Sequence, residues 1–95
     1  MVTAIVHIKA DVDRIPEVAQ TVAELNGVSE VYSITGEYDL LAMIRVARYE
    51  EIAEVVPGRI NKVPGVLQTE THIAFRTYSR HDLDAAFSIG LNDGD

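Results

Sequence analysis

The sequence predicts an α+β fold: a ferredoxin-like βαββαβ sandwich of the dimeric α+β barrel type, with an antiparallel four-stranded sheet and two helices on one face. Apolar residues follow strand and helix spacing in the order strand, helix, strand, strand, helix, strand. Residues 23–28 resemble residues 61–66, with Gly27 and Gly65 at matching places. Two such units in tandem predict the spatial strand order 4-1-3-2, and 95 residues leave room for one small core.

The first half of the chain predicts one strand and one helix. Residues 2–9 alternate between two faces, both apolar enough for a central strand. We expect Asp13 to cap the following helix, Pro16 to lie in its first turn, and Gly27 to follow its end. The apolar stripe of this helix consists of Ile15, Val18, Ala19, Val22 and Leu25.

A hairpin, a second helix and a last strand complete the pattern. Residues 28–34 and 40–46 predict two strands joined by a short connection. Pro57 interrupts the second helical pattern, which predicts either a kink or two short helices. The last strand is expected from Val66 to about Tyr78. One of its faces carries Leu67, Thr69, Thr71, Ile73 and Phe75.

The composition points to self-association. The chain has no cysteine, so disulfides and thiolate metal sites are excluded, while a domain this small is marginal alone. Because the first and third predicted strands are apolar on both faces, the helix-free face of the sheet would expose a large apolar patch on a monomer, and such patches mark protein interfaces. We therefore expect a homodimer that forms sheet against sheet.

The charge argues against nucleic acid as a direct partner. Eight basic residues stand against 15 acidic ones, a formal charge of −7, whereas nucleic-acid affinity depends on clustered Lys and Arg. No apolar run reaches the roughly 20 residues of a membrane helix, and no signal peptide is recognisable, so a cytoplasmic protein without a membrane partner is expected. We divide the chain into a folded domain, residues 1–78, and an acidic C-terminal extension, residues 79–95.

No motif for catalysis or metal binding is found. The three histidines, His7, His72 and His81, lack metal-ligand spacing, and the sequence contains neither a Gly-x-Ser-x-Gly motif nor a glycine-rich phosphate loop. We expect no enzyme activity, no cofactor, no catalytic residue and no metal site. Because the predicted fold brings their strands together, His7 and His72 could share a role at an interface, and a two-histidine metal site is a remote alternative.

The connection between the hairpin strands carries the candidate binding site. It combines a hydroxyl, a glycine, an aromatic ring and two carboxylates, which can hold both ends of a zwitterion. Thr69 and Thr71 could add hydroxyl groups, although threonines also pack ordinarily in strands. A plain hairpin turn with a packed tyrosine is the alternative. The five residues of this connection are Thr35, Gly36, Glu37, Tyr38 and Asp39.

Two segments of the chain carry a family resemblance. They are residues 26–41, Asn-Gly-Val-Ser-Glu-Val-Tyr-Ser-Ile-Thr-Gly-Glu-Tyr-Asp-Leu-Leu, and residues 62–71, Lys-Val-Pro-Gly-Val-Leu-Gln-Thr-Glu-Thr. Both resemble the RAM domain (regulation of amino acid metabolism). This is the effector-binding half of the Lrp/AsnC transcription regulators, and the resemblance covers residues 2–78. No helix-turn-helix precedes the first strand, so the resemblance implies a stand-alone form that senses a small amino acid or related metabolite. It also implies modulation of full-length Lrp/AsnC regulators by co-assembly.

The resemblance carries further expectations about assembly and site. It implies dimers paired through their sheets, joined into an octamer or decamer ring, with effectors held between dimers. On this basis Gly36, Tyr38 and Asp39 line the loop side of the site, and Thr69 and Thr71 line the strand side.

Two other classes of function stay open at this point. A small dimeric α+β barrel enzyme, either a cofactor-independent oxygenase or a haem-binding type, would need His7, His72 or Tyr78 inside a closed pocket. A purely structural assembly module would leave the cleft empty.

Overall fold

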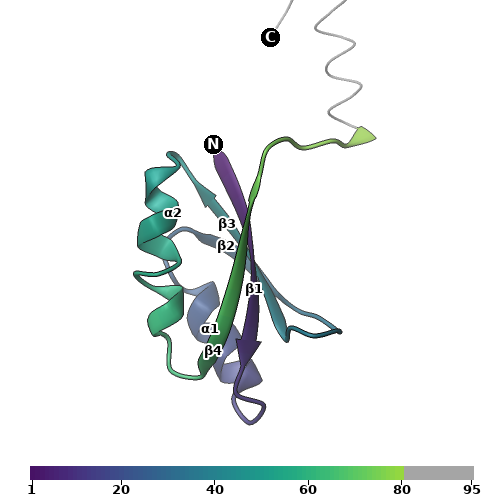
Figure 1. Cartoon of the computed structure of the whole chain (residues 1–95), viewed down its shortest axis with the longest axis vertical. Helices are drawn as coiled ribbons and strands as arrows, with labels where there is room; N and C mark the ends of the chain where they lie inside the picture. Colours follow the sequence, from purple (N-terminus) through teal and green to yellow (C-terminus); the bar gives the residue numbers. More distant parts are fainter. Residues whose placement is uncertain (81–95) are drawn as a thin grey trace, which may run out of the picture.

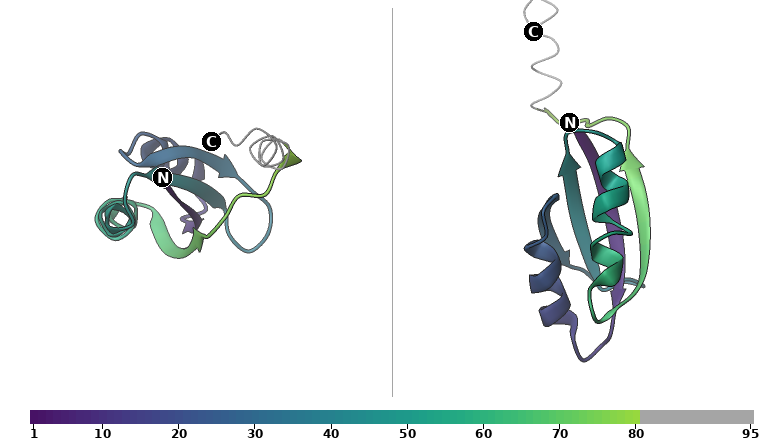
Figure 2. Two further views of the ribbon diagram at one scale, coloured as in Figure 1. Left: turned by 90° about the horizontal axis from the view of Figure 1, so that it is seen from above. Right: turned by 90° about the vertical axis from the view of Figure 1, so that its left-hand side faces the viewer.

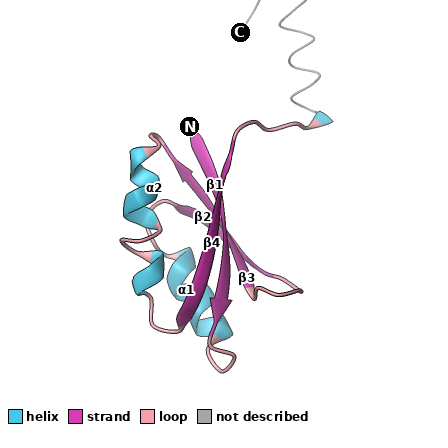
Figure 3. Ribbon diagram, viewed as in Figure 1, coloured by secondary structure: helices cyan, strands magenta, loops and turns pink. Residues whose placement is uncertain are grey.

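The fold is a four-stranded antiparallel sheet with two helices packed on one face (Figures 1 and 3). The computed structural model describes residues 1–80. The strand order is β2-β3-β1-β4, which confirms the predicted order 4-1-3-2. The elements are β1 (Val2–Ala10), α1 (Ile15–Ala23), β2 (Val28–Ser33), β3 (Leu40–Val46), α2 (Glu50–Val55), the 3₁₀ helix η1 (Ile60–Lys62) and β4 (Val66–Ala74).

The core lies between the sheet and the helices, which cover the same face (Figure 2). Alternate residues of the central strands point into it, because successive side chains of a strand point to opposite faces. The fully buried members of β1 and β3 meet Val18 and Val22 of α1 and Val55 of α2. These strand residues are Ala4, Val6, Ile8, Leu40, Ala42 and Ile44.

The two repeated glycines, Gly27 and Gly65, lie in equivalent turns that precede β2 and β4. Gly27 and Gly65 adopt φ angles of 95° and 98°, a left-handed conformation that glycine tolerates best. A Cβ atom on Gly27 would lie 2.6 Å from a Val55 methyl group, and one on Gly65 would lie 2.6 Å from a Val18 methyl group. Each glycine therefore lets its turn approach the helix of the other half of the chain.

Two helix predictions have different outcomes. The expectation that Asp13 caps α1 is wrong, because the N-cap residue is Arg14 and no side chain caps the helix. The Asp11 carboxylate instead accepts a hydrogen bond from the Asp13 backbone N–H at 3.1 Å and forms a turn before the helix. Pro57 divides the second helical segment, as the second of the two alternatives predicted, into α2 and η1.

Strand β4 ends earlier than the sequence pattern indicates. It stops at Ala74 rather than near Tyr78, because its partner β1 begins at Val2 and the last pair in register joins Thr3 to Ala74. Phe75 and Tyr78, beyond the strand, are exposed.

The boundary at residue 78 and the acidic extension of residues 79–95 stay predictions, and His81 and most of that extension lie outside the described residues. Within residues 1–80, no helix is long and apolar enough to cross a membrane.

Candidate functional site

The predicted binding loop connects β2 to β3 and is fixed at its base to β1. The Asp39 backbone N–H donates to the Ile8 carbonyl at 2.9 Å, and Asp39 Oδ2 accepts from the Ala10 N–H at 2.9 Å. Lys9 Nζ donates to the Glu37 carbonyl at 3.0 Å. One oxygen of the Asp39 carboxylate therefore positions the loop.

The tip of this loop is open to solvent (Figure 1). Thr35, Gly36 and Glu37 are exposed. Gly36 has a φ angle of 109°, and a Cβ atom placed on it would meet nothing within 4 Å. The loop thus presents a hydroxyl, a carboxylate and accessible backbone around Gly36, above a base that is held in place.

Tyr38 turns away from the tip and lies over the sheet face that the helices leave uncovered, which we call the open face. Its hydroxyl donates to Glu70 Oε1 at 2.8 Å, and its ring centroid lies 5.5 Å from that of His7. The hydrogen bond to Glu70 raises the pKa of Tyr38. Tyr38 therefore connects the hairpin loop to the open face.

Thr69 and Thr71 lie on the helix-covered side of β4. Their register partners on β1 are Ile8 and Val6, which both point into the core. Thr69 Oγ1 donates to Asn61 Oδ1 at 2.8 Å. Thr71 lines a cavity of about 490 Å³ between α2 and β4. The other lining residues are Tyr49, Glu50, Ile52, Ala53, Val56, Pro57 and Ile73.

Within one chain, the predicted site is therefore divided. The loop and Thr69 lie at the same end of the sheet, because Asp39 bonds to Ile8 and Ile8 pairs with Thr69. However, Tyr38 lies over the open face, whereas Thr69 and Thr71 lie on the opposite face. A single ligand does not touch both groups in one chain without a rearrangement.

The open face holds a polar cluster made of His7, Tyr38, Glu70 and His72. Glu70 Oε2 lies 2.8 Å from His72 Nε2, and the His7 and His72 rings meet edge to face with centroids 5.7 Å apart. Hydrogen bonds from Tyr38 and then from His72 hold the pKa of Glu70 below its ordinary value of 4.5. The expectation that His7 and His72 lie side by side is confirmed.

Glu70 was missing from the predicted site. The sequence placed it on the same face of the last strand as His72, and this alternation was the available signal. Within residues 1–80, no group of three metal-ligating side chains is suitably arranged for a metal ion. Tyr78, one of the three residues that the enzyme alternative could place in a closed pocket, is exposed.

The centre of the open face is an apolar strip on the two central strands. It consists of Ile5 on β1 and Leu41 and Met43 on β3, all half-buried. This strip is narrower than the large patch that the sequence predicted, because His7 interrupts it. It nevertheless lies between polar side chains on β2 and β4.

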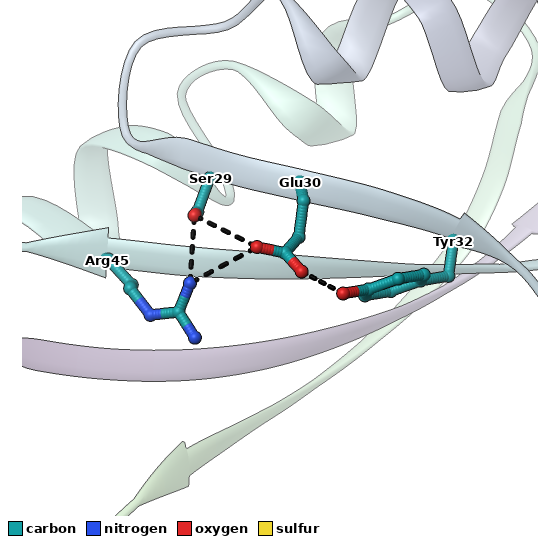
Figure 4. Close-up of polar contacts among 4 residues, drawn as sticks. All are labelled: Ser29, Glu30, Tyr32 and Arg45. Carbon is teal, nitrogen blue, oxygen red and sulfur yellow. Dashed lines mark hydrogen bonds and ion pairs between the residues drawn. The ribbon is translucent and has the colours of Figure 1, made fainter.

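The polar flank on the β2 side is a second cluster (Figure 4). Arg45 Nη1 donates to Ser29 Oγ at 2.9 Å and lies 3.4 Å from Glu30 Oε1. Tyr32 hydrogen-bonds the other oxygen of Glu30. The open face therefore combines an apolar strip with a charged rim, an arrangement found in many protein interfaces.

The fold and its loop define a ferredoxin-like α+β domain with an open sheet face and a solvent-exposed hairpin. The sequence profile of the "Lrp/AsnC ligand binding domain" matches residues 3–83. The chain belongs to this family, and the resemblance found in the sequence is confirmed.

Relatives agree with this assignment. An uncharacterized HTH-type transcriptional regulator of Pyrococcus furiosus is 38% identical over 78 residues, which are 79% of this chain and 52% of the relative. The crystal structure of TTHA0845 from Thermus thermophilus has a TM-score of 0.79 and 45% identity, over 84% of this chain and 100% of that one. The chain spans about half the length of the curated relatives it matches.

A second solved structure is that of a ligand-bound relative. It is the feast or famine regulatory protein Rv3291c of M. tuberculosis, complexed with L-methionine, which has a TM-score of 0.70 and 24% identity. The match covers 84% of this chain and 54% of that protein. At this identity the likeness establishes the shared fold.

Proposed function

We propose that this chain is a non-catalytic effector-sensing domain that binds a small amino acid or related metabolite at a site between subunits. The observation that carries the proposal is the hairpin loop, which is fixed at its base by Asp39 and exposed at Thr35, Gly36 and Glu37. Membership of the ligand-binding family, and the methionine complex of the mycobacterial relative, support an amino acid as the ligand.

The loop has groups for both ends of a zwitterion. The Thr35 hydroxyl and the Gly36 N–H can donate to an α-carboxylate, and the Glu37 carboxylate can accept from an α-ammonium. Asp39 can still accept through Oδ1, since Ala10 uses Oδ2. Tyr38 was expected to supply an aromatic wall, but its ring lies over the open face and not beside the groups at the loop tip.

A second subunit is needed because the two groups of predicted residues lie on opposite faces of one chain. In the proposed site, the loop of one subunit meets Thr69 and Thr71 of another. The cavity next to Thr71 is lined mainly by apolar side chains and offers space for the ligand's own side chain.

The proposed assembly begins with a dimer formed by two open faces. The strip of Ile5, Leu41 and Met43 would form the apolar centre of this interface, and the charged clusters would form its rim. An octamer or decamer ring of such dimers would bring loops and strands of different dimers together. Co-assembly with full-length Lrp/AsnC regulators through the same surfaces is the proposed route to transcription control.

A thermal-shift panel of the twenty amino acids tests the proposed site. A ligand at 100 times its Kd stabilises the folded state by about 2.7 kcal/mol. Thr35→Val and Glu37→Gln, at exposed positions, should reduce the shift without lowering the stability of the free protein. Glu17→Gln, on the exposed surface of α1, is the matched control.

The outcomes separate the competing functions. A thermal shift that both loop variants leave unchanged would show that the ligand binds outside this loop. An intact oligomer with no response to any amino acid would favour the purely structural assembly module.

A further inference from the structure

The polar cluster on the open face contains one carboxylate and two imidazoles. Glu70 lies 2.8 Å from His72 Nε2 and is also the cross-strand partner of His7. Nδ1 of His7 is buried and has no hydrogen-bond partner among the described residues. Imidazole is the side chain that ordinarily changes its charge between pH 5 and 8. A single carboxylate therefore lies beside two imidazoles.

Among residues 1–80, no acidic side chain other than Glu70 forms a hydrogen bond or ion pair with either imidazole. Lys9 follows His7 on the same face of β1, and Leu41 is the partner of His7 on β3. Glu30 on β2 is separated from β4 by two strands, roughly 14 Å at the usual strand spacing. The titratable and charged groups that surround the two histidines on this face are Glu70 on β4, Lys9 on β1, Glu37 and Tyr38 in the loop, Glu30 on β2 and Arg45 on β3.

We propose that His7 and His72 make the sheet-to-sheet dimer proton-dependent, so that it forms near neutral pH and dissociates as the pH falls below 6. This inference rests on the proposed dimer, since only a second copy over the open face would bury the cluster. On the strands of this face two acids, Glu30 and Glu70, stand against two bases, Lys9 and Arg45, and the exposed loop adds Glu37.

The expected direction of the pH effect on the dimer follows from the number of carboxylates that can pair with the two histidines. The first proton can be held as an ion pair between His72 and Glu70. The second proton, on His7, adds a charge without an acid of its own, and burying such a charge is unfavourable. A two-fold dimer would carry this charge twice. Dissociation returns both clusters to water, so acid favours the monomer.

The long-range charge of the chain acts in the opposite sense. Each copy carries a formal charge of −7 at neutral pH, and acidification lowers the repulsion between copies. Any weakening of the dimer in acid must therefore come from local groups, which makes the two effects separable by mutation.

Sedimentation velocity of the full chain at pH 7.5, 6.5 and 5.5, at constant ionic strength, tests the inference. The wild-type dimer should weaken by about tenfold or more between pH 7.5 and 5.5. The double variant His7→Gln, His72→Gln should lose this weakening. His72→Gln alone, at a half-exposed position, serves as a second variant in case His7→Gln lowers stability. Circular dichroism at each pH confirms folding.

His81→Gln is the matched control because it removes the one remaining histidine. A dimer that is equally tight at all three pH values would overturn this inference and leave the proposed dimer intact. A pH dependence that survives in the double variant or disappears in His81→Gln would also overturn it. A monomer at every pH would overturn the proposed dimer itself, and this inference with it.

Discussion

The two faces of the sheet are built from the same strands but have different roles. On the covered face, Ala4, Val6 and Ile8 are fully buried, whereas the intervening Ile5 and His7 on the open face are only half-buried. At these three positions of the covered face, burial is complete within one chain. The open face combines apolar and ionisable groups that one chain leaves accessible, which is suited to an association that can be reversed. Stability and the proposed assembly are thus assigned to alternate residues of the same strands.

The strongest test of this division compares two neighbours on β3. Ile44 is fully buried, and Met43 points to the open face. Ile44→Ala should lower the free energy of unfolding by about 2–5 kcal/mol, because it leaves a cavity in the core. Met43→Ala should cost less than about 1 kcal/mol in the monomer. Urea unfolding at low protein concentration measures both, and equal losses would contradict the division.

A charge on the apolar strip should affect assembly rather than folding. Met43→Arg would place a cation in the centre of the proposed interface and should weaken the dimer at least about 100-fold, or 2.7 kcal/mol. Gln20→Arg adds the same charge to the exposed side of α1 and should leave the dimer unchanged. Size-exclusion chromatography with light scattering distinguishes these results. An undiminished dimer in Met43→Arg would place the interface on another surface.

Substitutions in the glycine turns should have a smaller effect on the free energy of unfolding. Gly27→Ala and Gly65→Ala should each destabilise the fold by about 1–3 kcal/mol, since both add left-handed strain and a close contact with a helix valine. Gly36→Ala has the same backbone strain but open space around it, so its cost should be about 1 kcal/mol. Thermal unfolding of the three variants would reveal the difference. A Gly36 variant as unstable as the other two would mean that backbone strain alone accounts for the loss.

The smallest effect concerns acid stability on the open face. The pKa of Glu70 is lower in the folded protein than its ordinary value of 4.5, mainly because Tyr38 donates to it. The resulting stabilisation is present above pH 4.5 and is lost as the pH falls through the lower folded value. Because Glu70 is exposed, we expect only a slight effect. Glu70→Gln should make unfolding less dependent on pH between 5 and 3, whereas Glu17→Gln should not.

The repeat and the apolar spacing were sufficient to predict the strand order. Pro57 predicted an interruption of the second helix but left a kink and a division as alternatives. The repeat and the spacing could not predict where β4 ends, because this depends on the start of its partner at Val2. They also could not predict that Asp11, rather than Asp13, would form the turn before α1. Both details depend on contacts that a one-dimensional pattern does not contain.

The candidate site was only partly predictable for a similar reason. The sequence correctly grouped Thr69 with Thr71 on one face of the last strand, but it could not specify which face the helices cover. It also could not reveal that Asp39 bonds to Ala10 or that Tyr38 reaches Glu70. These contacts join residues about thirty positions apart. The residue types of the loop singled it out, the resemblance to Lrp/AsnC proteins gave it an expected role, and the three-dimensional structure added the link between that loop and the open face.

The crosswise packing of the two glycines has a consequence for folding cooperativity. Gly27 contacts Val55 in the second half of the chain, and Gly65 contacts Val18 in the first half. Although each half repeats the same pattern, neither half closes its turn without the helix of the other. We therefore expect all-or-none unfolding, with no stable half-molecule intermediate. An internal duplication has here produced a single folding unit, because the two halves are interlocked rather than placed side by side.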